Sequence, residues 1–264
     1  MLQQSSRFSA FCALNAGPIL RILAVFSLAC SSPAAASKPG PASVEQSLRG
    51  GDLNYITRPL DPEYRLRKDG AITLRVCYNW SCNQQERVTF TAEDMAEVLS
   101  YMTTCQGEGL HDRVQRMRIG VWRMQLLARK YVPLLANDKA INDDDAELEG
   151  RADCVDHTSN TNTYLHVLKA LGQLPGWTLL APQVRNVMSP HGVHWTPVVA
   201  DERTKREWSV DSWFHPNGQL PLVMPLRDWA ADKKAWEAPF SRLNPYPAYL
   251  QDLCPADTAQ APLP

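Results

Sequence analysis

Three residues suited to nucleophilic chemistry follow one another along the chain in an order that restricts its fold. Cys154 lies in the first turn of a segment with helical periodicity, His194 lies in the strand-like stretch GVHWTPVVADE, and Asp211 lies in the strand-like run EWSVDSWF. The charged turn DERTKRE separates the two runs, so we expect them to pair as a hairpin. The three side chains can meet only if the helix start packs against this hairpin. The three residues therefore have a consistent geometry, with the cysteine at a helix start beside the hairpin.

The helix prediction rests on a cap and on a periodic apolar pattern. Asp153 can accept hydrogen bonds from the first free amides of the helix as its N-cap. The apolar positions that recur at helical spacing are Tyr164, Leu165, Leu168 and Leu171. A cysteine in the first turn meets the positive end of the helix dipole, which lowers a thiol pKa from about 8.5 toward neutrality. We therefore expect Cys154 to be a thiolate nucleophile.

His194 and Asp211 suit the roles of base and orienting carboxylate. A carboxylate on the neighbouring strand can accept a hydrogen bond from one imidazole nitrogen and leave the other facing the thiol. His191 is the alternative base in the segment PHGVH, and we favour His194 because it begins the apolar run. On the helix, we expect His157 to lie at the surface and His166 to be a packing residue.

These residues resemble the transglutaminase-like superfamily, and within it the bacterial transglutaminase-like cysteine proteinases. Members carry D-C-x-D at the nucleophile, matched by Asp153, Cys154 and Asp156, then a histidine opening a valine-rich strand and an aspartate closing the next. The resemblance covers roughly residues 92–229. It implies a papain-like α+β core with the nucleophile at a helix N-terminus packed on an antiparallel sheet. In this core Cys154 is the nucleophile, His194 the general base and acid, and Asp211 the orienting partner.

The chain departs from the family pattern at two places. Members of the proteinase group usually have an acidic residue directly after the nucleophile, and some bind calcium nearby, whereas Val155 stands here. We therefore predict no metal. Transglutaminases proper often read H-x-W-x-E, whereas here Trp195 follows the histidine directly and Pro197 interrupts the pattern. This favours hydrolysis, with a protein cross-linking acyltransferase as the alternative.

An oxyanion hole needs two hydrogen-bond donors near the nucleophile. The backbone N–H of Cys154 is the first candidate. The resemblance implies that an upstream tryptophan or glutamine supplies the second, and the candidates are Gln115, Trp122 and Gln125, all on a helix predicted over residues 112–131. Trp122 is better explained as a core residue, because tryptophan contributes a large buried area.

The N-terminus predicts export. Residues 1–36 carry arginine but no acidic residue, and an apolar stretch too short to span a bilayer precedes the small residues Ala34, Ala35 and Ala36. We interpret residues 1–36 as a signal peptide, with lipoprotein processing at Cys30 as the alternative, and predict a periplasmic or secreted protein. Residues 37–62 are predicted to be a linker, 63–254 the hydrolase domain and 255–264 a disordered tail. No further apolar stretch is long enough for a membrane helix.

The cysteines fit an oxidising compartment. Of the seven cysteines, Cys12 and Cys30 belong to the predicted signal peptide, which leaves five. Four can form two disulfides while one stays free to react, and Cys154 is the natural free thiol. Three pairings are possible. We favour Cys77 with Cys82 across a turn between two strand-like runs, and Cys105 with Cys254.

Charge and motifs exclude several functions. The 27 basic and 28 acidic residues nearly balance, and no basic run suggests a nucleic-acid partner. Motifs for serine hydrolases, nucleotide binding, zinc proteases and redox cysteine pairs are missing, so we predict no cofactor. The expected partner is a peptide or protein substrate. A catalytically silent module that binds a peptide or an envelope component is the alternative from another class.

Two further helices and an acidic segment complete the interpretation. Thr91 and Asp94 resemble a capping box that starts a helix through about Thr103. The acidic segment before Cys154, residues 140–153, is better explained as a solvated loop than as a metal site, and its position just before the nucleophile also suits a lid. Residues 216–229 are expected to form strand and loop.

Overall fold

The computed structural model describes residues 60–141, 146, 148–186, 193–231, 240 and 253–254. These residues lie within one compact unit, residues 41–264. The predicted signal peptide, all but the last residues of the predicted linker, the predicted tail and His191 lie outside the described residues. None of the helices described is long and apolar enough to cross a membrane.

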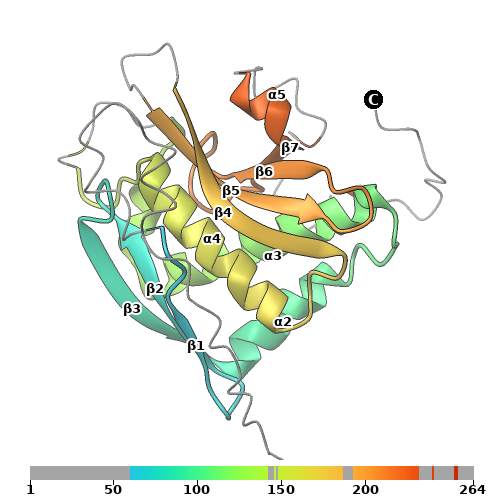
Figure 1. Cartoon of the computed structure of the whole chain (residues 1–264). Helices are drawn as coiled ribbons and strands as arrows, with labels where there is room; N and C mark the ends of the chain where they lie inside the picture. The colour runs from blue at the N-terminus through green and yellow to red at the C-terminus, as the bar shows by residue number, and fades with distance from the viewer. Residues whose placement is uncertain are drawn as a thin grey trace, which may run out of the picture. The chain divides into compact units, whose positions relative to one another are not determined.

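The described chain combines helices with two antiparallel sheets, which confirms the α+β class (Figure 1). A three-stranded sheet has the order β1-β2-β3, and a four-stranded sheet has the order β4-β5-β6-β7. In chain order the elements are β1 (Tyr64–Leu66), β2 (Ile72–Tyr78), β3 (Gln84–Phe90), α2 (Ala92–Met102), α3 (Leu110–Tyr131), the 3-10 helix η1 (Pro133–Asn137), α4 (Cys154–Ala170), β4 (Trp177–Asn186), β5 (Val193–Asp201), β6 (Glu207–Asp211), β7 (Leu222–Pro225) and α5 (Leu226–Ala230).

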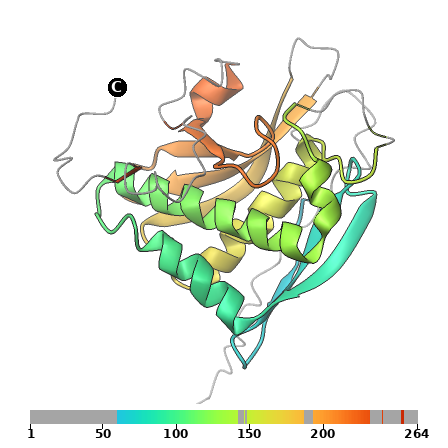
Figure 2. The same cartoon turned by 180° about the vertical axis from the view of Figure 1, so that it is seen from behind.

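Helix α4 lies between the two sheets, in contact with β2 on one side and β5 on the other (Figure 1). Helices α2 and α3 pack together, and α3 also packs on α4 (Figure 2). Because α4 is covered on several sides, it is buried from Val155 to Leu165 even where its sequence is polar. The predicted apolar positions Tyr164, Leu165 and Leu168 lie in the main core.

The polar residues of α4 find partners in the elements around it. The Asn160 amide accepts a hydrogen bond from the backbone N–H of Cys77 at 2.7 Å and donates one to its carbonyl at 2.8 Å. Asn162 donates to the carbonyl of Leu60 at 2.9 Å, and Thr161 shares a hydrogen bond with Ser212 at 2.9 Å. The buried polar side chains therefore attach α4 to both sheets.

Two helices start close to the predicted positions. Thr91 and Asp94 form the predicted capping box, and α2 follows it. Helix α3 starts at Leu110, slightly before the predicted position, and ends at Tyr131. An apolar face of α3 is buried in the main core, formed by Val114, Met117, Val121, Met124 and Leu127. The segment expected as strand and loop forms β7 and the short helix α5.

The predicted hairpin is formed by β5 and β6. Val198 pairs with Ser209 and Ala200 with Glu207 in an antiparallel register. Asp201 closes the turn, because its carboxylate accepts backbone hydrogen bonds and also pairs with the buried Arg113 guanidinium at 2.7 Å. The hairpin therefore has a fixed position beside α3 and α4.

The two favoured disulfides are present. Cys77 is bonded to Cys82, and Cys105 to Cys254. Among the described residues, Cys154 is the free cysteine. The thiol predicted to react is thus the one that the disulfides leave unpaired.

Candidate active site

A pair of carboxylates fixes the start of α4. Asp153 accepts hydrogen bonds from the backbone N–H groups of Val155 at 3.0 Å and Asp156 at 2.9 Å. Asp156 returns the contact by accepting from the backbone N–H of Asp153 at 3.2 Å. This capping box ends the preceding loop at Asp153, so that α4 begins at Cys154 as predicted.

The turn between β2 and β3 donates backbone hydrogen bonds to the same carboxylates. Four consecutive residues of this turn have left-handed φ angles, which are 60° at Asn79, 63° at Trp80, 53° at Ser81 and 58° at Cys82. Such a run is unfavourable for residues other than glycine and persists only when its surroundings fix it. Asp156 accepts from the backbone of Trp80 at 2.8 Å and of Cys82 at 2.6 Å, and Asp153 accepts from Ser81 at 3.0 Å.

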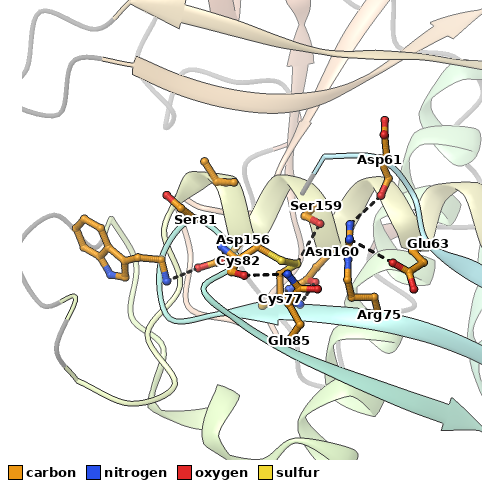
Figure 3. The surroundings of a disulfide bond; sticks show 12 residues. Asp61, Glu63, Arg75, Cys77, Ser81, Cys82, Gln85, Asp156, Ser159 and Asn160 are labelled. Atoms are coloured by element: carbon orange, nitrogen blue, oxygen red, sulfur yellow. Dashed lines mark hydrogen bonds and ion pairs between the residues drawn. A yellow bond between two sulfur atoms is a disulfide. The ribbon is translucent and has the colours of Figure 1, made fainter. Parts of the chain in front are cut away.

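Figure 3 shows this turn beside the helix, closed by the disulfide between Cys77 and Cys82. Both cysteines are buried. The backbone bonds to Asp153 and Asp156 join the turn to the residues on either side of Cys154. The three-stranded sheet therefore determines where the first turn of α4 lies.

The pKa of Cys154 is raised, which contradicts the predicted lowering. Burial is the main cause, the carboxylate of Asp153 adds to it, and a hydrogen bond from the backbone of Trp195 opposes it. The prediction was wrong mainly because the thiol is buried, and also because the cap is itself an anion. Its charge lies where the helix amides would otherwise favour a thiolate. Cys154 still keeps part of its surface exposed.

His194 and Asp211 form a short buried hydrogen bond on the other side of α4. The distance from His194 Nε2 to Asp211 Oδ2 is 2.6 Å, and both residues are buried. Asp211 also accepts from the backbone N–H of Trp213 at 3.1 Å and from the indole of Trp229 at 2.8 Å. Burial alone raises the pKa of Asp211, but His194 and these donors outweigh it and hold the pKa below its usual value.

The second ring nitrogen of His194 is left without a hydrogen bond. Among the described residues, Nδ1 is buried and has no partner. The ring is enclosed by aromatic side chains, with centroid distances of 4.6 Å to Trp213, 5.4 Å to Phe214 and 5.6 Å to Trp229. This enclosure was not predicted, although Trp213 and Phe214 follow Asp211 closely in sequence.

Cys154 meets the hairpin at the strand that carries His194. The Cys154 sulfur lies 3.9 Å from the carbonyl oxygen of Val193, and the backbone of Trp195 donates a hydrogen bond to the thiol. These two residues flank His194 in β5. The structure therefore brings the start of α4 to the strand that carries His194, although His194 Nδ1 makes no hydrogen bond to the thiol.

The other histidines have different surroundings. The expectation that His157 lies at the surface is wrong, because its ring is buried and bridges Ser212 at 3.0 Å and Asp138 at 3.1 Å. His166 is partly buried, and burial lowers its pKa. Both lie on α4, and in the described part of the chain neither is hydrogen-bonded to Asp211, so His194 is the histidine paired with the carboxylate.

The three candidate oxyanion side chains make bonds within the protein core. Gln115 accepts from Arg118 at 2.8 Å, Trp122 donates to the carbonyl of Gly218 at 3.0 Å, and Gln125 accepts from the backbone of Gly218 at 2.8 Å. All three are buried on α3. These bonds give them a structural role in holding the loop before β7.

The carboxylates near Cys154 are not arranged to hold a metal. The oxygens of Asp153 and Asp156 accept several backbone hydrogen bonds, which satisfies them without an ion. In the described part of the chain, His111, Asp112 and Cys254 offer ligand atoms within 4.8 Å of one another. Cys254 is bonded to Cys105, so its sulfur cannot supply a thiolate.

Comparison with known proteins identifies no relative of the chain. No model of a known protein family matches the chain, and neither does any curated protein or solved structure with which it was compared. A function for the site must therefore be argued from the residues of this chain.

Proposed function

We propose that the chain is an exported thiol hydrolase that cleaves an amide bond in a peptide or protein through an acyl-enzyme on Cys154. The observation that carries the proposal is the 2.6 Å bond between His194 Nε2 and Asp211 Oδ2. With Nε2 bonded in this way, Nδ1 of His194 has no hydrogen-bond partner among the described residues, and the strand that carries His194 contacts the thiol through its backbone. A base oriented by a buried carboxylate is what an uncharged nucleophile needs.

In the proposed reaction, His194 activates a thiol. Because burial and Asp153 raise the pKa of Cys154, the sulfur attacks as Nδ1 removes its proton. The sulfur–carbon bond forms, and the carbonyl oxygen takes the negative charge. When the C–N bond breaks, His194 returns the proton to the leaving amine. Water then attacks the thioester, again losing a proton to His194, and releases the acid and the thiol.

Asp211 stabilises the protonated ring that exists between these steps. Its pKa is held below the usual value by His194 and its other donors, so it stays ionised. The backbone N–H of Cys154 is the proposed first oxyanion donor, because the amides that Asp153 binds are those of Val155 and Asp156.

The arrangement supports a papain-like core and membership of the transglutaminase-like superfamily. A cysteine at a helix N-terminus faces an antiparallel sheet whose neighbouring strands carry a histidine and an aspartate. Two disulfides in the described residues support an oxidising compartment, and hence a periplasmic or secreted location.

The raised pKa of Cys154 favours a second candidate, a catalytically silent module that binds a peptide at the same junction. Such a module would keep the thiol protonated and perform no acyl transfer. The two candidates differ in whether an acyl-enzyme forms.

The test is to incubate the disulfide-bonded protein with casein and with a proteome-derived peptide library. The hydrolase produces new peptide N-termini, and mass spectrometry after acid quenching detects a peptide acyl group on Cys154. Cys154→Ala and His194→Ala abolish both signals, whereas His166→Ala, which removes another histidine of the same domain, keeps them. Cleavage that persists in Cys154→Ala would refute the proposal, and binding without acylation would favour the silent module.

A further inference from the structure

Trp229 is bonded to the same oxygen atom as His194. Its indole Nε1 donates to Asp211 Oδ2 at 2.8 Å, and His194 Nε2 lies 2.6 Å from that oxygen. The other carboxylate oxygen accepts from the backbone N–H of Trp213. Both oxygens of Asp211 are therefore held by donors that come from three different segments of the chain.

The indole ring also contacts His194 and Arg185. Its centroid lies 5.6 Å from that of His194, and the Arg185 guanidinium carbon lies 4.6 Å from the indole centroid. Arg185 and His194 are direct partners in the β4–β5 register, so their side chains project from the same face of the sheet. Arg185 additionally donates to the Trp229 carbonyl. Strand β4 thus fixes the position of Trp229.

Apolar packing fixes the same residue from the other side. Trp229 is fully buried, and it forms a cluster with Leu222 and Met224 of β7, against which Phe214 packs. A buried ring with contacts on several elements has little freedom to turn. Its N–H group is therefore presented to Asp211 in one direction.

We propose that Trp229 is a positioning residue for the candidate active site, an inference that rests on the proposed function. By donating to Asp211 Oδ2, the indole prevents the carboxylate from rotating away from His194. The imidazole then keeps Nε2 on the carboxylate and Nδ1 available to the thiol. Trp229 touches neither the thiol nor a substrate in this scheme, and acts through Asp211 and His194.

The test compares Trp229→Phe with the matched control Trp208→Phe. Trp208 lies on β6 and is as deeply buried as Trp229. Its indole N–H has no hydrogen-bond partner among the described residues. The measured quantity is the rate of Cys154 alkylation by iodoacetamide from pH 5 to 10. Loss of one donor to a buried carboxylate predicts that Trp229→Phe lowers the His194-dependent rate at pH 7 about tenfold, while Trp208→Phe leaves it unchanged.

A spectroscopic readout separates positioning from general destabilisation. The Nε2 proton of His194 in its bond to Asp211 gives a downfield NMR resonance, which is expected to move upfield and exchange faster in Trp229→Phe but not in the control. If Trp229→Phe does not fold, replacing the indole with a benzothiophene ring keeps the shape and removes only the N–H. The same shift is expected there.

The outcomes distinguish this inference from the proposed function. If wild-type alkylation depends on His194 but the resonance and rate are unchanged in Trp229→Phe, the positioning role is refuted and the hydrolase proposal stands. If alkylation is independent of His194 while the resonance responds to Trp229→Phe, the hydrolase proposal fails although the geometric role is supported. An unchanged resonance and rate in both tryptophan variants would overturn the inference.

Discussion

The two sides of the first turn of α4 are built differently. On the side of the three-stranded sheet, Asp153 and Asp156 accept backbone hydrogen bonds from a disulfide-closed turn. On the side of the four-stranded sheet, His194 and Asp211 are joined through side chains, and His194 Nδ1 has no partner among the described residues. One side is saturated with hydrogen bonds, whereas the other retains an unused proton acceptor.

This difference separates placement from reactivity. The saturated side fixes where Cys154 lies, but its carboxylate charge raises the pKa of the thiol. In the proposed mechanism, the imidazole on the other side removes the thiol proton. Changes on the first side are therefore expected to alter stability and the position of Cys154, and changes on the second side to alter its reactivity.

The largest expected change in stability comes from a disulfide remote from the β2–β3 turn. The Cys105–Cys254 bond joins residues that are 149 positions apart in the sequence, whereas the Cys77–Cys82 bond joins residues that are 5 positions apart. Loop entropy predicts losses of about 5 kcal/mol and about 2 kcal/mol when the respective pairs are changed to alanine. Urea unfolding of the two double variants measures this difference.

The same two variants compare stability with reactivity. Because the Cys77–Cys82 turn is seated on Asp153 and Asp156, its loss is expected to change the alkylation rate of Cys154 more than loss of Cys105–Cys254 does. The alkylation rate of Cys154 is measured under conditions in which both variants are folded. A larger change in the variant without Cys105–Cys254 would contradict the role of the turn in positioning Cys154.

Asp156→Ala is expected to cost about 3 kcal/mol of unfolding free energy or more. The change leaves three backbone N–H groups without their acceptor, a buried one at Cys82 and partly buried ones at Trp80 and Asp153. Thr91→Ala removes the ordinary cap of α2 and serves as the control, with an expected loss of about 1 kcal/mol. Equal losses in chemical unfolding would show that Asp156 is only a helix cap.

Asp153→Asn is expected to have the smallest effect of these changes, and it should increase the alkylation rate of Cys154. The amide oxygen of asparagine can still cap Val155 and Asp156, while its NH2 group replaces the oxygen that accepts from Ser81. The change also removes the charge that, after burial, raises the pKa of Cys154 most. A lower thiol pKa increases the thiolate fraction below that pKa, so alkylation at pH 8 is expected to accelerate about threefold to tenfold. Asp112→Asn, in the first turn of α3, is the control. A slower rate in Asp153→Asn would contradict the electrostatic explanation.

The α4 helix shows what local pattern could and could not predict. Its cap and the apolar positions Tyr164, Leu165 and Leu168 are readable from neighbouring residues, and they were predicted correctly. The burial of residues 158–163 was not predicted, because their partners lie in β2 and after β6. His157 was misplaced for the same reason, since Asp138 and Ser212 are distant in sequence.

The pKa of Cys154 could have been predicted better from the sequence. Asp153 was recognised as the cap, and its negative charge beside the thiol follows from that assignment. The prediction of a lowered pKa takes account of the helix dipole but not of the anion that lies at its positive end. By contrast, no local signal identifies Trp229, because its contact with Asp211 depends on how α5 packs against the four-stranded sheet.

The most direct test of the account is the pH dependence of Cys154 alkylation in the wild type and in His194→Ala, with the disulfides intact and the site of labelling identified by mass spectrometry. A raised thiol pKa combined with a base at His194 predicts that the wild type reacts at least about tenfold faster at pH 7, and that the variant reacts appreciably only at alkaline pH. Superimposable profiles for the two proteins would contradict the account, because the thiol would then react without the imidazole.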